Sequence, residues 1–79
     1  MTPIQFQILH ILFRVRCEGG YRATDLFAKI FVKGRRHFGA FESELKALLK
    51  IKYVKQDRFG YYTLTEYAIF LFEEGYFDE

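Results

Sequence analysis

Lysine and arginine gather in the middle of this 79-residue sequence. Residues 22–58 carry ten basic side chains against four acidic ones, whereas residues 59–79 carry five acids and no lysine or arginine. A face that concentrates lysine and arginine gains affinity for nucleic acid, because its binding releases the counterions condensed on the phosphates. These residues therefore favour the binding of phosphate groups. The alternative is a solvated basic surface that has no partner.

The groups that catalysis or a metal site would need are sparse. Neither His10 nor His37 has a second histidine or cysteine at metal-ligand spacing, and Cys17 is the only cysteine. Ser43 has no neighbouring base, and Gly19-Gly20 lacks the spacing and the lysine of a phosphate-binding loop. We therefore expect no enzyme activity, no metal, no cofactor and no small-molecule ligand.

The spacing of apolar residues predicts four helices in a single domain. Thr2-Pro3-Ile4-Gln5 is a helix start signal, with an N-cap threonine, a proline at the first helical position and a glutamine three residues after the cap. The helices are predicted at about 3–16, from 23 or 24 to Gly34, from between 36 and 39 to about 51, and at about 66–74. Strands are predicted at 21–22, 53–56 and 61–64, and Asp57-Arg58-Phe59-Gly60 joins the last two as an antiparallel hairpin.

The order helix, strand, helix, helix, hairpin, helix resembles a winged helix-turn-helix domain. Leu48, then Tyr53-Val54, a polar hairpin and Tyr62-Thr63-Leu64-Thr65-Glu66 are similar to the segment that leaves the recognition helix, forms the wing and enters the last helix. Gly39-Ala40-Phe41-Glu42-Ser43-Glu44-Leu45 resembles the start of the recognition helix in PadR-like regulators, with Glu42-Ser43 in place of the tyrosine-proline pair common there. The resemblance implies an α+β winged-helix domain over residues 1–79. Its helix-turn-helix spans about 24–51, its two-stranded wing about 53–64 and its terminal helix about 65–75.

The resemblance also implies double-stranded DNA as a partner, with the third helix in the major groove and the wing on the minor groove. If Phe38, Phe41, Leu45 and Leu48 face the core, the 100° step of a helix places Arg36, Ala40, Ser43, Lys46, Ala47 and Lys50 outward. The predicted DNA-binding residues are Lys33, Arg35, Arg36, His37, Ser43, Lys46, Lys50, Lys55 and Arg58. Glu42 and Glu44 flank the outward face and count against its binding to DNA, since a carboxylate there must pair with a basic neighbour or accept a hydrogen bond from cytosine N4. Phe59 at the hairpin tip is either exposed or folded back onto the core.

The terminal helices carry more apolar residues than one small core needs. The helix at 66–74 is apolar on every side for nearly two turns, and the helix at 3–16 has two apolar stripes. We therefore expect a homodimer whose interface contains Phe6, Leu9, Phe13, Phe70, Phe72, Tyr76 and Phe77. The alternative is a small domain that uses all these side chains in its own core.

Together these features predict a sequence-specific DNA-binding protein that regulates transcription as a homodimer, like the small regulators of prokaryotes and of their viruses and plasmids. The alternative is a winged helix used only for contacts between proteins.

The single Cys17 excludes an internal disulfide, leaves an intermolecular one open and favours an intracellular protein. Arg14 and Arg16 interrupt the longest apolar run and residues 1–15 lack the features of a signal peptide, so we expect a cytoplasmic protein without a membrane span. The sequence has no asparagine, a thermolabile residue, which favours a thermophilic source.

Overall fold

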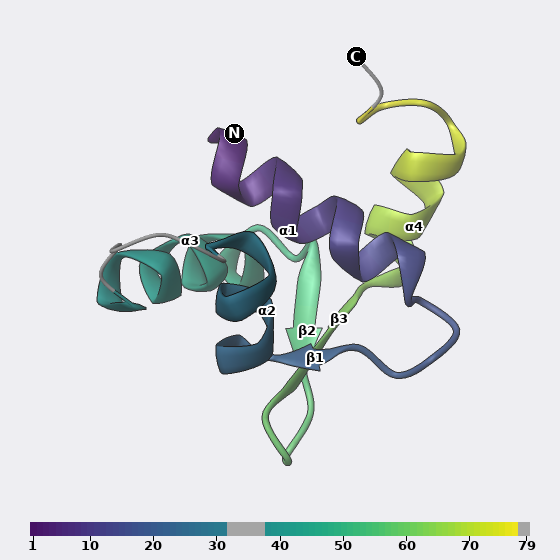
Figure 1. Ribbon diagram of the computed structural model, residues 1–79. Helices are drawn as coiled ribbons and strands as arrows, with labels where there is room; N and C mark the ends of the chain where they lie inside the picture. The colour runs from purple at the N-terminus through teal and green to yellow at the C-terminus, as the bar shows by residue number, and fades with distance from the viewer. Residues whose placement is uncertain (32–37, 78–79) are drawn as a thin grey trace.

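The computed structural model describes residues 1–31 and 38–77. In these residues the chain has an α+β fold with four helices and one three-stranded antiparallel sheet (Figure 1). The elements are α1 (Pro3–Arg14), β1 (Tyr21–Arg22), α2 (Ala23–Ile30), α3 (Phe38–Lys50), β2 (Val54–Gln56), β3 (Tyr61–Leu64) and α4 (Glu66–Glu73). The predicted element order is confirmed, and most of the predicted boundaries lie within two residues of the observed ones.

Local signals explain where the helices begin and end. The Thr2 hydroxyl accepts a hydrogen bond of 3.2 Å from the Gln5 backbone N–H, and the Gln5 side chain accepts one of 3.1 Å from the Thr2 N–H, which confirms the predicted capping box. At the end of α3, Lys52 adopts a positive φ of 67° and the Tyr53 N–H bonds to the Leu48 carbonyl at 3.0 Å. This Schellman-type arrangement ends the helix and turns the chain into β2.

The sheet has the strand order β1-β3-β2. In β1, Tyr21 pairs with Tyr62 and Arg22 with Tyr61, so this two-residue strand lies beside the half of β3 that is nearer the hairpin tip. Gly20 permits this approach, because a Cβ atom at this position would lie 2.1 Å from the carbonyl oxygen of Tyr62. Its φ of 84° also favours glycine.

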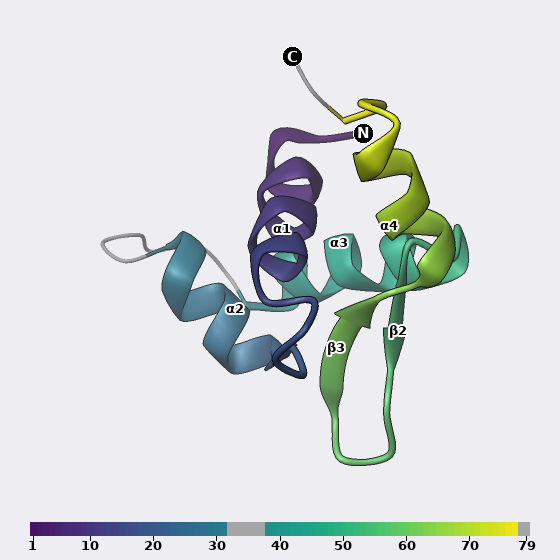
Figure 2. The same ribbon diagram turned by 90° about the vertical axis from the view of Figure 1, so that its right-hand side faces the viewer.

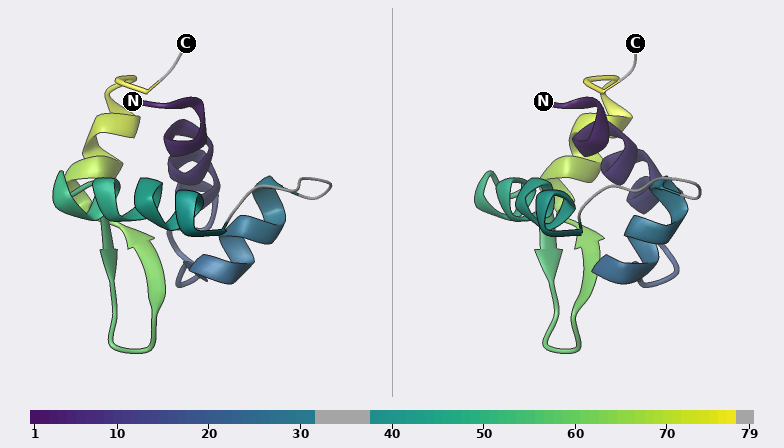
Figure 3. Two further views of the ribbon diagram at one scale, coloured as in Figure 1. Left: turned by 90° about the vertical axis from the view of Figure 1, so that its left-hand side faces the viewer. Right: turned by 60° about the vertical axis from the view of Figure 1, so that its left-hand side comes forward.

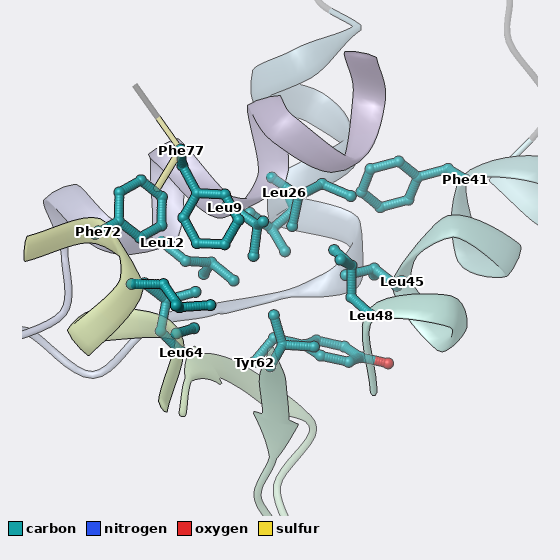
Figure 4. Packing of buried hydrophobic residues seen from close by; sticks show 14 residues of the cluster. Leu9, Leu12, Leu26, Phe41, Leu45, Leu48, Tyr62, Leu64, Phe72 and Phe77 are labelled. Carbon is teal, nitrogen blue, oxygen red and sulfur yellow. The ribbon is translucent and has the colours of Figure 1, made fainter. Parts of the chain in front are cut away.

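One hydrophobic core joins all four helices to the sheet (Figure 4). Ile8, Leu9 and Leu12 of α1 lie at its centre and are at most 1% exposed. The other buried apolar residues are Leu26, Phe41, Leu45, Leu48, Val54, Tyr62, Leu64, Ala68, Leu71, Phe72 and Phe77. The β2–β3 hairpin extends from this body on the side opposite to the two chain ends (Figures 2 and 3).

The second apolar stripe of α1 is covered by the same chain. Phe13 stacks on Phe72 with ring centroids 4.4 Å apart, and Phe6 meets the edge of Phe77 at 6.3 Å. Leu9, Phe72 and Phe77 are buried in the core, so the structure corrects their assignment to a dimer interface. Of the seven residues expected there, only Phe70 and Tyr76 are largely exposed, at 55% and 75%.

Within the described residues, no helix is both long enough and apolar enough to cross a membrane.

Candidate nucleic-acid interface

Helix α3 has one buried face and one face that no other element of the described residues covers. Phe41, Leu45 and Leu48 are at most 1% exposed, and their spacing of four and three residues keeps them on the same side of the helix. The opposite side, which we call the uncovered face of α3, consists of Gly39, Ala40, Ser43, Lys46, Ala47 and Lys50. All of these are exposed except Ala47, which is half-buried. The face therefore presents small and basic side chains. It contains five of the six residues predicted to point outward, together with Gly39, and the sixth, Arg36, lies outside the described residues.

Glu44 is turned away from the uncovered face and towards α1. Its carboxylate accepts hydrogen bonds of 2.8 Å from the Thr2 hydroxyl and 3.2 Å from the Gln5 side-chain amide. Thr2 and Gln5 form the capping box of α1, so the negative charge of Glu44 lies at a helix N-terminus, where the helix dipole stabilises it. Glu44 therefore does not belong to the uncovered face.

Glu42 is half-buried on α3, and its negative charge acts on the side chain of Tyr62 in β3. Burial of the Tyr62 hydroxyl is the main cause that raises its pKa above the ordinary value of about 10, and the charge of Glu42 raises the pKa further. Both carboxylates of α3 therefore act on other parts of the protein.

The polar groups on the uncovered face differ in their availability. The Ser43 hydroxyl donates a hydrogen bond of 3.1 Å to the Gly39 carbonyl, so its proton is used within the helix and its oxygen is left as an acceptor. Lys46 and Lys50 are exposed and have no ion pair or side-chain hydrogen bond in the part of the chain that the structure describes. They lie four residues apart and so share one edge of the face.

The tip of the hairpin is held by the side chain of Asp57. One carboxylate oxygen accepts hydrogen bonds from the backbone N–H groups of Phe59 at 2.8 Å and Tyr61 at 2.9 Å. Gly60 closes the turn with a φ of 89° and an N–H bond of 3.1 Å to the Asp57 carbonyl. Phe59 is 64% exposed, which decides between the two alternatives for this residue: it does not fold back onto the core.

Lys55 lies on the face of the sheet that points away from the core. Val54, Tyr62 and Leu64 face the core, and because side chains alternate along a strand, Lys55 and its partner Thr63 point to the opposite side. The structure therefore does not bring Lys55 to the side of the sheet on which α3 packs. Arg58 is exposed at the hairpin tip, with its guanidinium 5.2 Å from the ring centroid of Phe59.

Arg22 is a basic residue that we did not predict in the site. It is exposed beside β3, with its guanidinium 4.9 Å from the ring centroid of Tyr61. The pairing of Arg22 with Tyr61 places both on the same outer sheet face as Lys55. A two-residue strand offers no alternation in the sequence, so only the register of the sheet reveals this cluster.

Four predicted DNA-binding residues, Lys33, Arg35, Arg36 and His37, fall outside the described residues. Along the chain they directly precede Phe38, the first residue of α3. Their contribution to the interface stays a prediction.

No group of three or more histidine, cysteine or acidic side chains that could hold a metal ion occurs among residues 1–31 and 38–77. We compared the chain with models of known protein families, with curated proteins and with solved structures, and found no match in any of the three.

Proposed function

We propose that this protein binds double-stranded DNA as a winged helix-turn-helix domain, with α3 as the recognition helix and the β2–β3 hairpin as the wing. The observation that carries the proposal is the composition of the uncovered face of α3. It combines small residues with two lysines that have no ion pair within the described residues, while Glu44 is hydrogen-bonded to α1. A recognition helix needs such a face to approach base edges without repelling the phosphates.

Each kind of side chain on this face has a role in the proposed complex. Gly39, Ala40 and Ala47 let the helix axis come close to the floor of the major groove. Lys46 and Lys50 contact phosphates, which fix the position of the helix on the duplex. The free acceptor of Ser43 suits the amino group of cytosine or adenine, which are the donors in the major groove.

The distribution of charge supports the same orientation. The exposed acids Glu66, Glu73 and Glu74 belong to α4 and its C-terminal end, on the other side of the body from the hairpin tip (Figure 2). The hairpin carries the exposed Arg58 at its tip, and its one acid, Asp57, is engaged by backbone N–H groups. DNA along α3 and the hairpin would therefore lie away from the acidic end of the chain.

We further propose that the protein regulates transcription as a homodimer on a two-fold symmetric site. Phe70 and Tyr76 expose large aromatic rings near the C-terminus and would contact the second copy. A dimer would present two copies of α3 to successive major grooves, and it would repress transcription by occupying a promoter.

A second candidate is a protein-interaction module that does not bind DNA. Besides Phe70 and Tyr76, the exposed side chains of Ile51 and Tyr67 favour it, at 48% and 55% exposure. Exposed apolar surface of this kind suits a protein partner as well as it suits a second copy.

The dependence of duplex binding on salt separates the two candidates. We expect the purified protein to bind a labelled mixed-sequence duplex at about 50 mM salt and to lose affinity steeply by about 200 mM, because each phosphate contact releases counterions. Selection from random duplexes should then enrich inverted repeats. If the folded protein binds no duplex even at low salt, the interaction module is the better account.

A further inference from the structure

The tip of the hairpin exposes an aromatic ring far from the core. Phe59 is 64% exposed, and among the large apolar residues in the described part of the chain only Tyr76 is more exposed. A single exposed apolar side chain is common on protein surfaces. Phe59 differs because it belongs to the turn at the end of a projecting hairpin (Figure 1), where no other element among residues 1–31 and 38–77 covers it.

The backbone beneath this ring is fixed. The carboxylate of Asp57 binds the N–H groups of Phe59 and Tyr61, the Gly60 N–H binds the Asp57 carbonyl, and the Asp57 N–H binds the Tyr61 carbonyl at 3.0 Å. A flexible loop would lose conformational entropy on binding, whereas the backbone that carries this ring is already held by these hydrogen bonds. The turn is therefore suited to pressing Phe59 into a partner.

The charge around the ring favours nucleic acid as that partner. The guanidinium of Arg58 lies 5.2 Å from the centroid of the Phe59 ring. The only acid of the hairpin is Asp57, and its charge is engaged by backbone N–H groups. An apolar side chain beside an arginine matches the minor groove, where arginine is drawn to the negative potential and an apolar wedge can enter between base pairs.

We propose that Phe59 inserts between two neighbouring base pairs from the minor groove and kinks the duplex there. This inference rests on the proposed DNA-binding function and adds an effect on the shape of the DNA. When α3 occupies the major groove, the hairpin would meet the flanking minor groove, Arg58 would contact its edge, and the ring of Phe59 would unstack one step. A wedge of this kind bends DNA by roughly 20–90°.

The kink would also create sequence preference at a position that α3 does not touch. Pyrimidine–purine steps such as TA unstack most easily, whereas A-tracts are stiff. The protein would therefore prefer a site with a TA or CA step beneath the hairpin.

Two optical signals test the wedge on one duplex. The probe is a duplex of about 25 base pairs with a fluorescence donor and acceptor at its ends and 2-aminopurine in place of the adenines of its TA steps. With the wild-type protein we expect higher energy transfer, because the duplex bends, and brighter 2-aminopurine, because its base is unstacked. We expect Phe59→Ala to abolish both signals and to weaken binding about tenfold, with unchanged dependence on salt.

Two further variants serve as controls. Phe59→Leu retains an apolar wedge and should keep most of both signals. Tyr67→Ala removes a ring that is 55% exposed on α4, and it should change neither signal. If the wild-type protein binds without bending or unstacking, or if Phe59→Ala bends the duplex as the wild type does, the wedge is overturned while DNA binding stands. If the wild type does not bind the duplex at all, the proposed function fails as well.

Discussion

The carboxylate of Glu44 in α3 accepts a hydrogen bond of 2.8 Å from the hydroxyl of Thr2, the residue that caps α1. The same carboxylate accepts a second bond, of 3.2 Å, from Gln5. One side chain of the proposed recognition helix is thus joined to the start of the helix at the centre of the core. The bond fixes how α3 lies against α1, and it keeps a negative charge away from the uncovered face.

We expect Glu44→Ala to lower the free energy of unfolding by about 1–2 kcal/mol, because Thr2 and Gln5 lose a charged acceptor. Glu44→Gln retains one acceptor oxygen and should lose less. Urea denaturation measures both changes. Glu73→Ala is the control, since this exposed carboxylate has no hydrogen bond or ion pair within the described residues. Equal stability of Glu44→Ala and Glu73→Ala would show that the link contributes nothing.

Gly19 and Gly20 form a matched pair that separates backbone strain from steric overlap. Both have a positive φ, of 103° and 84°, but a Cβ atom would meet nothing within 4 Å at Gly19 and the Tyr62 carbonyl oxygen at Gly20. We expect Gly19→Ala to cost about 1–2 kcal/mol through strain alone. Gly20→Ala should cost about 2 kcal/mol more, because β1 must move off β3. Thermal unfolding of the two variants would contradict this account if their losses were equal.

The raised pKa of Tyr62 predicts a loss of stability at alkaline pH. Because the folded protein holds the phenolic proton more tightly than the unfolded chain, the stabilisation is complete below pH about 10 and is lost as the pH rises through the higher pKa of the folded state. We expect the wild type to lose stability relative to Tyr62→Phe when the pH is raised from about 9 to values above about 10. Urea denaturation at each pH measures this difference. A constant difference across that range would contradict the prediction.

Phe70 and Phe72 distinguish the proposed dimer interface from the core. Phe70 is 55% exposed, so Phe70→Ser should weaken self-association at little cost to the stability of the monomer. Phe72 is 8% exposed and stacks on Phe13, so Phe72→Ser should destabilise the fold by roughly 3 kcal/mol or more. Sedimentation velocity and urea denaturation report the two effects. A wild-type protein that stays monomeric at high concentration would remove the dimer from the account.

The spacing of apolar residues was enough to predict the helices and the hairpin. The capping signal at Thr2 is local, and Thr2 is the N-cap of α1, just as Thr65 is the N-cap of α4. The predicted end of α2 was less accurate. We expected Gly34 to end the helix, but the helix ends at Ile30.

Features that depend on contacts between distant parts of the chain could not be predicted from the sequence. The partners of Glu44 lie at positions 2 and 5, about forty residues away, and no local pattern reveals them. The same holds for Phe72 of α4 and for Phe77, which follows α4; both rings pack onto α1, and α4 is apolar on all sides. In such a helix the spacing of apolar residues does not predict which side is buried in the core. The apolar surplus therefore predicted more interface than the structure leaves exposed.

The central claim, that the uncovered face of α3 contacts DNA, is tested most directly by a matched pair of charge-removing variants. Lys46→Ala/Lys50→Ala removes two positive charges from this face, and Arg14→Ala/Lys29→Ala removes two from exposed positions on α1 and α2. Affinity for a mixed-sequence duplex is measured by fluorescence anisotropy over a range of salt concentrations. The account predicts that the α3 variant binds more weakly and that its dependence of log K on log salt is shallower by about one unit for each lost phosphate contact, while the control binds as the wild type does. Equal effects of the two variants, or an α3 variant that binds as the wild type does, would contradict it.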